Sequence, residues 1–148
     1  MHVLAVRVMG NVEEAARAAA TAFVEAWAGA RYRLAARQVP SGLGWFGRRM
    51  TAEQWVAHME RAQGRTVLPL RFVGVLGPGM SVLGARAEVV RALGGPLGPE
   101  DRLFLFDLTR GRRTATAGVV VHSAPTSAQV LRVIDPTEIK RLVDTTAA

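Results

Sequence analysis

The sequence predicts a single α+β domain in which helices come first and antiparallel strands follow. In the first third of the chain, apolar residues recur at helical spacing. From residue 67 onward they occur instead in short runs separated by turns rich in glycine and proline. These turns are too short for helical crossovers, so the strands are expected to pair antiparallel. Because helices and strands are segregated along the chain, the class is α+β rather than α/β.

The first helix is expected to begin at Asn11, with Glu14 three residues later as the partner in a capping box. Gly29 is expected to bend or end this helix. Residues 1–10 are apolar but few, and we interpret them as a strand or a loose N-terminal arm rather than a signal peptide. The apolar stripe of the helix consists of Ala16, Ala19, Ala20, Phe23, Val24 and Trp27.

The second helix is expected after a glycine-rich loop at residues 41–47. Thr51 and Gln54 form another capping-box pair at its start, and Gly64 suits its C-terminal end. Its buried face is expected to contain Trp55, Val56, Met59 and Ala62.

The second half of the chain predicts strands and a closing helix. A hairpin turn is expected at Arg110-Gly111-Arg112. A short helix is expected from Asp135 and Pro136, docked by Ile139, Leu142 and Val143, before a frayed tail at residues 145–148. The expected strands are Val67–Leu76, Ser81–Arg91, Arg102–Thr109, Arg113–His122 and Ala128–Ile134. No linker divides residues 1–148, so one domain is predicted.

The composition excludes several classes of protein. At 49% hydrophobic residues and a mean hydropathy of +0.16, the chain can bury a core and is not expected to be disordered. It has no cysteine, which rules out disulfides, thiolate nucleophiles and zinc–sulfur sites. The absence of cysteine fits a reducing cytoplasm, and no apolar run approaches the roughly 20 residues that span a bilayer, so a cytoplasmic location without membrane contact is expected.

The formal charge of +7 suggests polyanion binding, but the cations are scattered along the chain. Among the 19 basic residues Lys140 is the only lysine, a bias typical of a GC-rich bacterial genome. We therefore interpret the arginines as solvated surface and expect no nucleic acid partner. The three histidines lack ligand spacing and no phosphate-binding loop occurs, so neither metal nor cofactor is expected.

Two residues are candidates for catalysis. Asp107 lies within an apolar strand, and a carboxylate that faces a closed interior would have a raised pKa and act as a general acid or base. Alternatively, Asp107 faces solvent or pairs with an arginine such as Arg113. His122 ends a valine-rich strand, where it would either bind a ligand at a cavity mouth or lie at the surface.

Aromatic residues are the main candidates for ligand binding. Tryptophans around a concave sheet often line pockets, although Trp27 and Trp55 also suit an ordinary core. Trp45, in the glycine-rich loop, is the candidate for a pocket lid. The candidate ligand-binding residues are Trp27, Tyr32, Trp45, Trp55, His58 and Thr116.

The order of elements resembles the nuclear transport factor 2-like superfamily, which includes ketosteroid isomerases, limonene epoxide hydrolases, polyketide cyclases and non-catalytic binding domains. Residues Ala15–Trp27 resemble its opening helix, and residues 130–142 resemble its closing strand and the segment after that strand. The resemblance covers about residues 12–144. It implies a cone-shaped α+β barrel in which a curved antiparallel sheet wraps the N-terminal helices and ligands enter at the open end.

The chain departs from the enzymes of that superfamily. Phe23 and Trp27 stand where the isomerases have a tyrosine, and the late strand Arg113–His122 offers Thr114 and Thr116 instead of a carboxylate. The Asp–Arg–Asp set of the epoxide hydrolases is not recognisable either. The resemblance therefore implies a pocket domain for a small apolar molecule, with isomerase, cyclase or hydrolase activity optional. The alternatives are a basic module that binds nucleic acid or an acidic protein, and a non-catalytic dimerisation domain that forms a homodimer.

Overall fold

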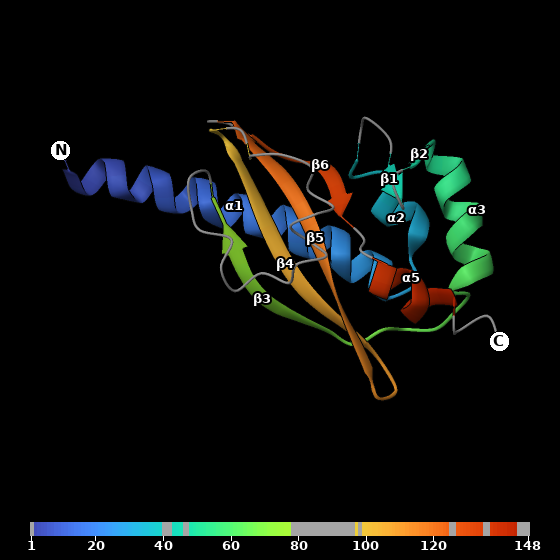
Figure 1. Ribbon diagram of the computed structural model, residues 1–148. Helices are drawn as coiled ribbons and strands as arrows, with labels where there is room; N and C mark the ends of the chain where they lie inside the picture. Colours follow the sequence, from blue (N-terminus) through green and yellow to red (C-terminus); the bar gives the residue numbers. More distant parts are fainter. Residues whose placement is uncertain are drawn as a thin grey trace.

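The computed structural model confirms the α+β class: helices pack against an antiparallel sheet (Figure 1). It describes residues 2–39, 43–45, 48–77, 97, 99–124, 127–134 and 137–144. Several of the expected features therefore lie outside the described residues. These are the strand Ser81–Arg91, the start of the last helix at 135–136, the tail at 145–148 and the side chain of Trp45.

Helix α1 (His2–Ala28) starts earlier than expected, because the backbone of residues 2–10 is helical. The interpretation of residues 1–10 as a strand or loose arm is therefore wrong for this part of the chain. Asn11 lies inside the helix and does not cap it. Periodicity cannot distinguish a short apolar strand from the end of a helix, and this explains the difference.

Helix α1 ends where Gly29 predicts, but the left-handed residue is Ala30, with φ of 61°. The Arg31 N–H donates to the Ala26 carbonyl at 2.7 Å, which closes the helix end in the manner of a Schellman motif. At Gly29, a Cβ atom would lie 2.9 Å from the Glu25 carbonyl oxygen, so only glycine fits there. The chain then reverses into a short helix, α2 (Tyr32–Ala36).

The loop expected at residues 41–47 contains strand β1 (Leu43–Trp45), which pairs antiparallel with β2 (Arg48–Met50). Helix α3 (Ala52–Ala62) follows, and its capping box is confirmed. The Thr51 side chain accepts a hydrogen bond from the Gln54 N–H, and the Gln54 side chain accepts one from the Thr51 N–H. Gly64, with φ of 62°, ends the helix as expected.

The main sheet has the order β3-β4-β5-β6, and all its neighbouring strands are antiparallel. Its strands are β3 (Leu70–Leu76), β4 (Asp101–Arg110), β5 (Arg113–Ala124) and β6 (Ser127–Ile134). The predicted β4–β5 hairpin is confirmed, with Gly111 at φ of 59° in its turn. Helix α5 (Thr137–Asp144) follows β6 and is docked, as expected, by Ile139, Leu142 and Val143.

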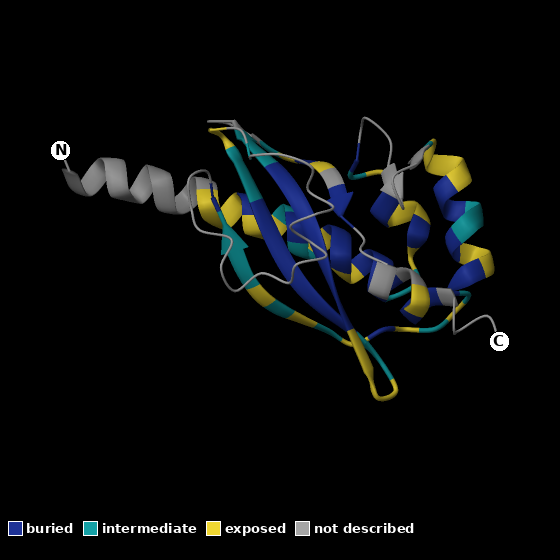
Figure 2. Ribbon diagram, viewed as in Figure 1, coloured by how far each residue is buried: buried dark blue, intermediate teal, exposed yellow. Residues whose placement is uncertain are grey.

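Helix α1 crosses one face of this sheet and contacts all four of its strands (Figure 1). We call this the inner face. Its side chains form one buried cluster with α1, α3 and α5, visible as the dark ribbon segments in Figure 2. On β4 the members of this cluster are Phe104, Phe106 and Leu108, which meet Phe23 and Trp27 of α1 in the same cluster. The predicted apolar stripe of the first helix therefore covers the sheet.

The alternate residues of the sheet lie on the opposite side, which we call the outer face. Leu103, Leu105, Val120 and Ile134 form a second, smaller buried cluster there. Strand register places Asp107 on this face too, beside Arg71 of β3 and Thr116 of β5. The two faces therefore carry different side chains. Among the described residues, only the outer face combines a buried apolar cluster with a row of charged and polar side chains.

Candidate functional site

Asp107 lies on the outer face and belongs to a row of polar side chains across three strands. The Thr116 hydroxyl donates to Asp107 Oδ1 at 2.7 Å, and Arg71 Nη2 donates to Asp107 Oδ2 at 3.0 Å. Asp107 is only 8% exposed and Thr116 only 3%, whereas the Arg71 side chain is 77% exposed. Both carboxylate oxygens thus accept hydrogen bonds from neighbouring strands.

This geometry bears on the two interpretations of Asp107. The carboxylate lies on the face of the sheet opposite α1, outside the interior between α1 and the sheet, and its catalytic role stays a prediction. An arginine partner is present, as the alternative interpretation expected, but the observed partner is Arg71 of the neighbouring strand rather than Arg113 across the hairpin. We interpret the row as a structural link between the three neighbouring strands β3, β4 and β5. Thr116, a candidate ligand-binding residue, supports Asp107 within it.

His122, the second catalytic candidate, lies near the end of β5 between two carboxylates. Its Nδ1 is 2.9 Å from Asp101 Oδ1, and its Nε2 is 3.4 Å from Glu100 Oε2. The imidazole is 40% exposed, so part of the ring is open to solvent. Asp101 and His122 are direct partners in the β4–β5 ladder, which fixes this pair at one end of the sheet.

Three aromatic candidates, Trp27, Tyr32 and Trp55, come together where α1, α2 and α3 meet. The ring centroids of Tyr32 and Trp55 are 6.0 Å apart, and the Phe23 ring lies 6.2 Å from Trp55 and 6.4 Å from Trp27. All are buried, and the two tryptophans are at most 1% exposed. These rings therefore pack against one another as core, as the core interpretation of Trp27 and Trp55 expected.

The aromatic group contains two buried polar anchors. The Tyr32 hydroxyl donates to the Gly64 carbonyl at 2.6 Å, and burial, with a smaller contribution from Glu60, raises the pKa of Tyr32 to about 12. The Gln63 amide donates to the carbonyls of Trp27 and Thr66 and ties the end of α1 to the end of α3. Sequence analysis missed Gln63, because an amide at a helix end carries no distinguishing pattern.

His58 is half-buried on α3, one turn beyond Trp55. The side chain of Trp45, the candidate lid, lies outside the described residues, so the lid hypothesis stays a prediction. Neither position has a described contact that identifies a ligand site.

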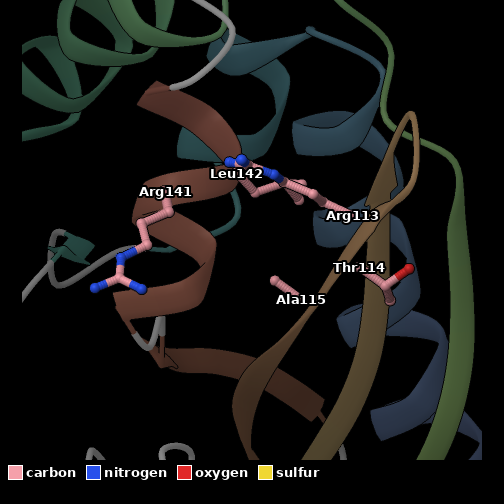
Figure 3. Close-up of a pocket in the computed structure, with 5 residues that line it drawn as sticks. All are labelled: Arg113, Thr114, Ala115, Arg141 and Leu142. Carbon is pink, nitrogen blue, oxygen red and sulfur yellow. The ribbon is translucent and has the colours of Figure 1, made fainter.

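A cleft opens between the start of β5 and helix α5, at the hairpin end of the sheet (Figure 3). Its volume is about 350 Å³, and its lining residues are Arg113, Thr114, Ala115, Arg141 and Leu142. Ala115 and Leu142 belong to the buried cluster of the inner face and form an apolar floor. Arg113 and Ala115 point from β5 toward α5, Thr114 points the other way, and Arg141 projects outward from α5 (Figure 3).

The cleft joins residues 26 positions apart in sequence, Ala115 and Arg141, which is why sequence analysis did not find it. The run of arginines at the hairpin was the one signal that pointed there. A second hollow, of about 380 Å³, lies along α1 and is less suitable, because all the residues that line it come from one helix and cannot enclose a ligand.

The candidate residues do not form one site. Along β5, His122 lies eight positions after Thr114 at the cleft, a distance of roughly 26 Å at the usual strand rise. The described side chains include no group of three or more histidine, aspartate or glutamate residues placed to hold a metal ion. The described helices also include none that is long and apolar enough to cross a membrane.

No protein-family model, curated protein or solved structure matches this chain. Its function is therefore inferred from the geometry of the cleft and from the arrangement of the elements around it.

Proposed function

We propose that this protein is a small-molecule-binding domain of the nuclear transport factor 2-like type, and that its ligand binds in the cleft between β5 and α5. The observation that carries the proposal is the cleft itself. Its volume of about 350 Å³ lies within the range of roughly 300–1,000 Å³ that is usual for small-molecule sites. Its floor is apolar, because Ala115 and Leu142 line it.

The arrangement of the elements supports the proposed family. A long first helix contacts every strand of the main antiparallel sheet, and along the chain a small hairpin, β1–β2, separates the first two helices from α3. In a cone of this kind the sheet would curl around α1, and the ligand would enter at an open end. The cleft lies at the hairpin end of the sheet, where α5 packs its apolar side chains against β4 and β5. In the proposed arrangement this would be the open end.

A neutral apolar dye, N-phenylnaphthylamine, provides the test, because its fluorescence rises when it leaves water. The isotope-labelled protein is titrated with the dye, and backbone amide shifts are followed by NMR. We expect the shifts to concentrate at Ala115, Arg141 and Leu142, while Asp101 and His122 at the far end of the sheet stay unchanged.

A variant confirms the location. Ala115→Ile fills the floor of the cleft and should weaken dye binding at least tenfold. Val73→Ile, at an exposed position of the edge strand β3, adds one carbon away from the cleft and should leave binding unchanged. Circular dichroism and thermal melting establish that both variants fold.

Two outcomes would overturn the proposal. If no amide shifts occur up to the solubility limit of the dye, the protein has no site of this kind. If the shifts centre on Trp27, Tyr32 and Trp55 instead, the ligand enters the aromatic core and the cleft is not the site.

A further inference from the structure

We propose that the ligand of the cleft carries an acidic group, such as a carboxylate or a phosphate, and that Arg113 and Arg141 bind it. This inference rests on the proposed function, since it names the ligand class of the same site. Apart from the apolar floor and Thr114, the described residues that line the cleft are these two arginines. One comes from the sheet and the other from α5, so the fold brings cations from two distant segments to one cleft.

Charge and apolar surface occur side by side in the cleft. The guanidinium of Arg113 extends toward α5 near Leu142, while Ala115 lies on the same side of the strand (Figure 3). A ligand that lies on Ala115 and Leu142 would therefore place its end within reach of a guanidinium. This matches a molecule with an apolar body and an anionic end better than it matches a wholly apolar one.

The chemistry of arginine favours this assignment. A guanidinium stays charged at any ordinary pH and offers five N–H donors in a planar fork that fits two oxygens of one acid. Both residues are exposed, so a solute can reach their guanidinium groups from solvent. Arg141 projects outward from α5 (Figure 3), so it can meet an acidic group that extends to the rim of the cleft.

The charges at the two ends of the β4–β5 pair also favour an anionic ligand at the cleft end. Arg110 and Arg112 lie in the same hairpin as Arg113, so this end of the β4–β5 pair is cationic. At its opposite end the same pair of strands carries the acidic Glu100 and Asp101 next to His122. The charges of the β4–β5 pair therefore favour an anionic solute at the cleft end, where the sequence of α5 contains Lys140 and Arg141 together with Glu138 and Asp144.

The test uses two dyes that differ by a single acidic group. Anilinonaphthalenesulfonate is N-phenylnaphthylamine with an added sulfonate, so the ratio of their affinities isolates the contribution of the anion. For the native protein we expect the sulfonate dye to bind at least tenfold more tightly at low salt. Added salt should reduce this ratio, because it screens exposed charges.

Matched variants assign the effect to residues. Arg113→Gln and Arg141→Gln should each weaken the sulfonate dye about fivefold or more, and leave the neutral dye within about twofold. Arg112→Gln removes the same charge from the same hairpin, but outside the cleft lining, and should change either affinity less than twofold. Thermal melting of each variant verifies that it is folded.

The results separate failure of this inference from failure of the proposed function. If both dyes bind the native protein at the cleft with equal affinity, the site is real and the acidic ligand is wrong. If Arg112→Gln lowers the affinity for the sulfonate dye as much as Arg113→Gln does, the effect comes from the general positive charge of the hairpin and not from contacts of Arg113. The inference then also fails. If neither dye binds, the proposed function itself is wrong.

Discussion

The two faces of the sheet bury different kinds of side chain. The inner face is apolar along β4, where Phe104, Phe106 and Leu108 pack against α1 and the other helices. The outer face combines a small apolar cluster with the row formed by Arg71, Asp107 and Thr116. An apolar face is stable without exact partners, whereas a buried carboxylate is tolerated only when its hydrogen bonds are made. We therefore expect the inner face to provide most of the stability and the outer row to fix strand register.

The largest effect is expected on the inner face. Phe106 is fully buried and contacts the Phe72 ring, with centroids 5.7 Å apart. Phe106→Ala should lower the free energy of unfolding by about 3–5 kcal/mol, because it removes the buried ring and leaves a cavity. Urea denaturation followed by circular dichroism measures the change. Val73→Ala, at an exposed site, is the control and should cost less than about 0.5 kcal/mol.

The buried row on the outer face should give the next largest effect. Asp107→Ala removes the acceptor of the buried Thr116 hydroxyl and should cost about 2–3 kcal/mol. Arg71→Ala should cost less than about 1 kcal/mol, because the Arg71 side chain is mostly exposed and its charge is screened. Equal losses in the two variants, measured by urea denaturation, would show that the ion pair and not the Thr116 hydrogen bond stabilises the row.

The free energy of unfolding at alkaline pH tests the burial of Tyr32, which belongs to the buried cluster of the inner face. Burial raises the pKa of Tyr32 to about 12, from 10.0. Below pH 10 the phenol is protonated in both the folded and the unfolded states. Between about pH 10 and pH 12 only the unfolded chain ionises, so the free energy of unfolding should fall as pH rises, by about 1–2 kcal/mol.

The composition leaves few other groups that titrate in this pH range. Tyr32 is the only tyrosine and Lys140 the only lysine, and the arginines do not titrate in this range. Tyrosinate absorbance of the native protein should therefore report one group, and Tyr32→Phe should abolish this part of the pH dependence. A midpoint near pH 10 in the folded protein would show that the phenol is open to water.

The smallest effect is expected at the exposed end of the outer face. The hydroxyl oxygens of Thr109 and Thr114 are 3.2 Å apart at the protein surface, one ladder position before the hairpin turn. Thr109→Val should change the free energy of unfolding by less than about 0.5 kcal/mol, because water replaces the lost partner. A loss comparable with that of Asp107→Ala in the same urea experiment would mean that burial does not distinguish the two polar pairs.

Patterns that act over a few residues predicted much of the fold. Thr51 and Gln54 specified the start of α3, Gly64 specified its end, and the glycine between two strand-like runs specified the β4–β5 hairpin. Each of these signals depends on the local geometry of the backbone, so its meaning does not change with tertiary context. The signal failed at residues 2–10, where a short apolar run suits both strand and helix.

The candidate site was only partly predictable. Trp27 and Trp55 suited an ordinary core, and they are core, but sequence alone could not show that Phe23 lies beside both rings and that Tyr32 packs on Trp55. Nor could it show on which face Asp107 lies, because one residue of register reverses the face of every side chain in a strand.

By itself, the sequence determined the α+β class, the absence of cysteine chemistry, the arginine-rich charge and the limits of α3 and the hairpin. These properties follow from residue identity and from interactions within a few positions. Only the tertiary structure decided that Arg71 is the partner of Asp107 and that Arg113 and Arg141 lie on the walls of one cleft. Such pairings join distant segments, and they depend on how the packing of α1 and α5 on the inner face fixes the strands, which no local pattern encodes.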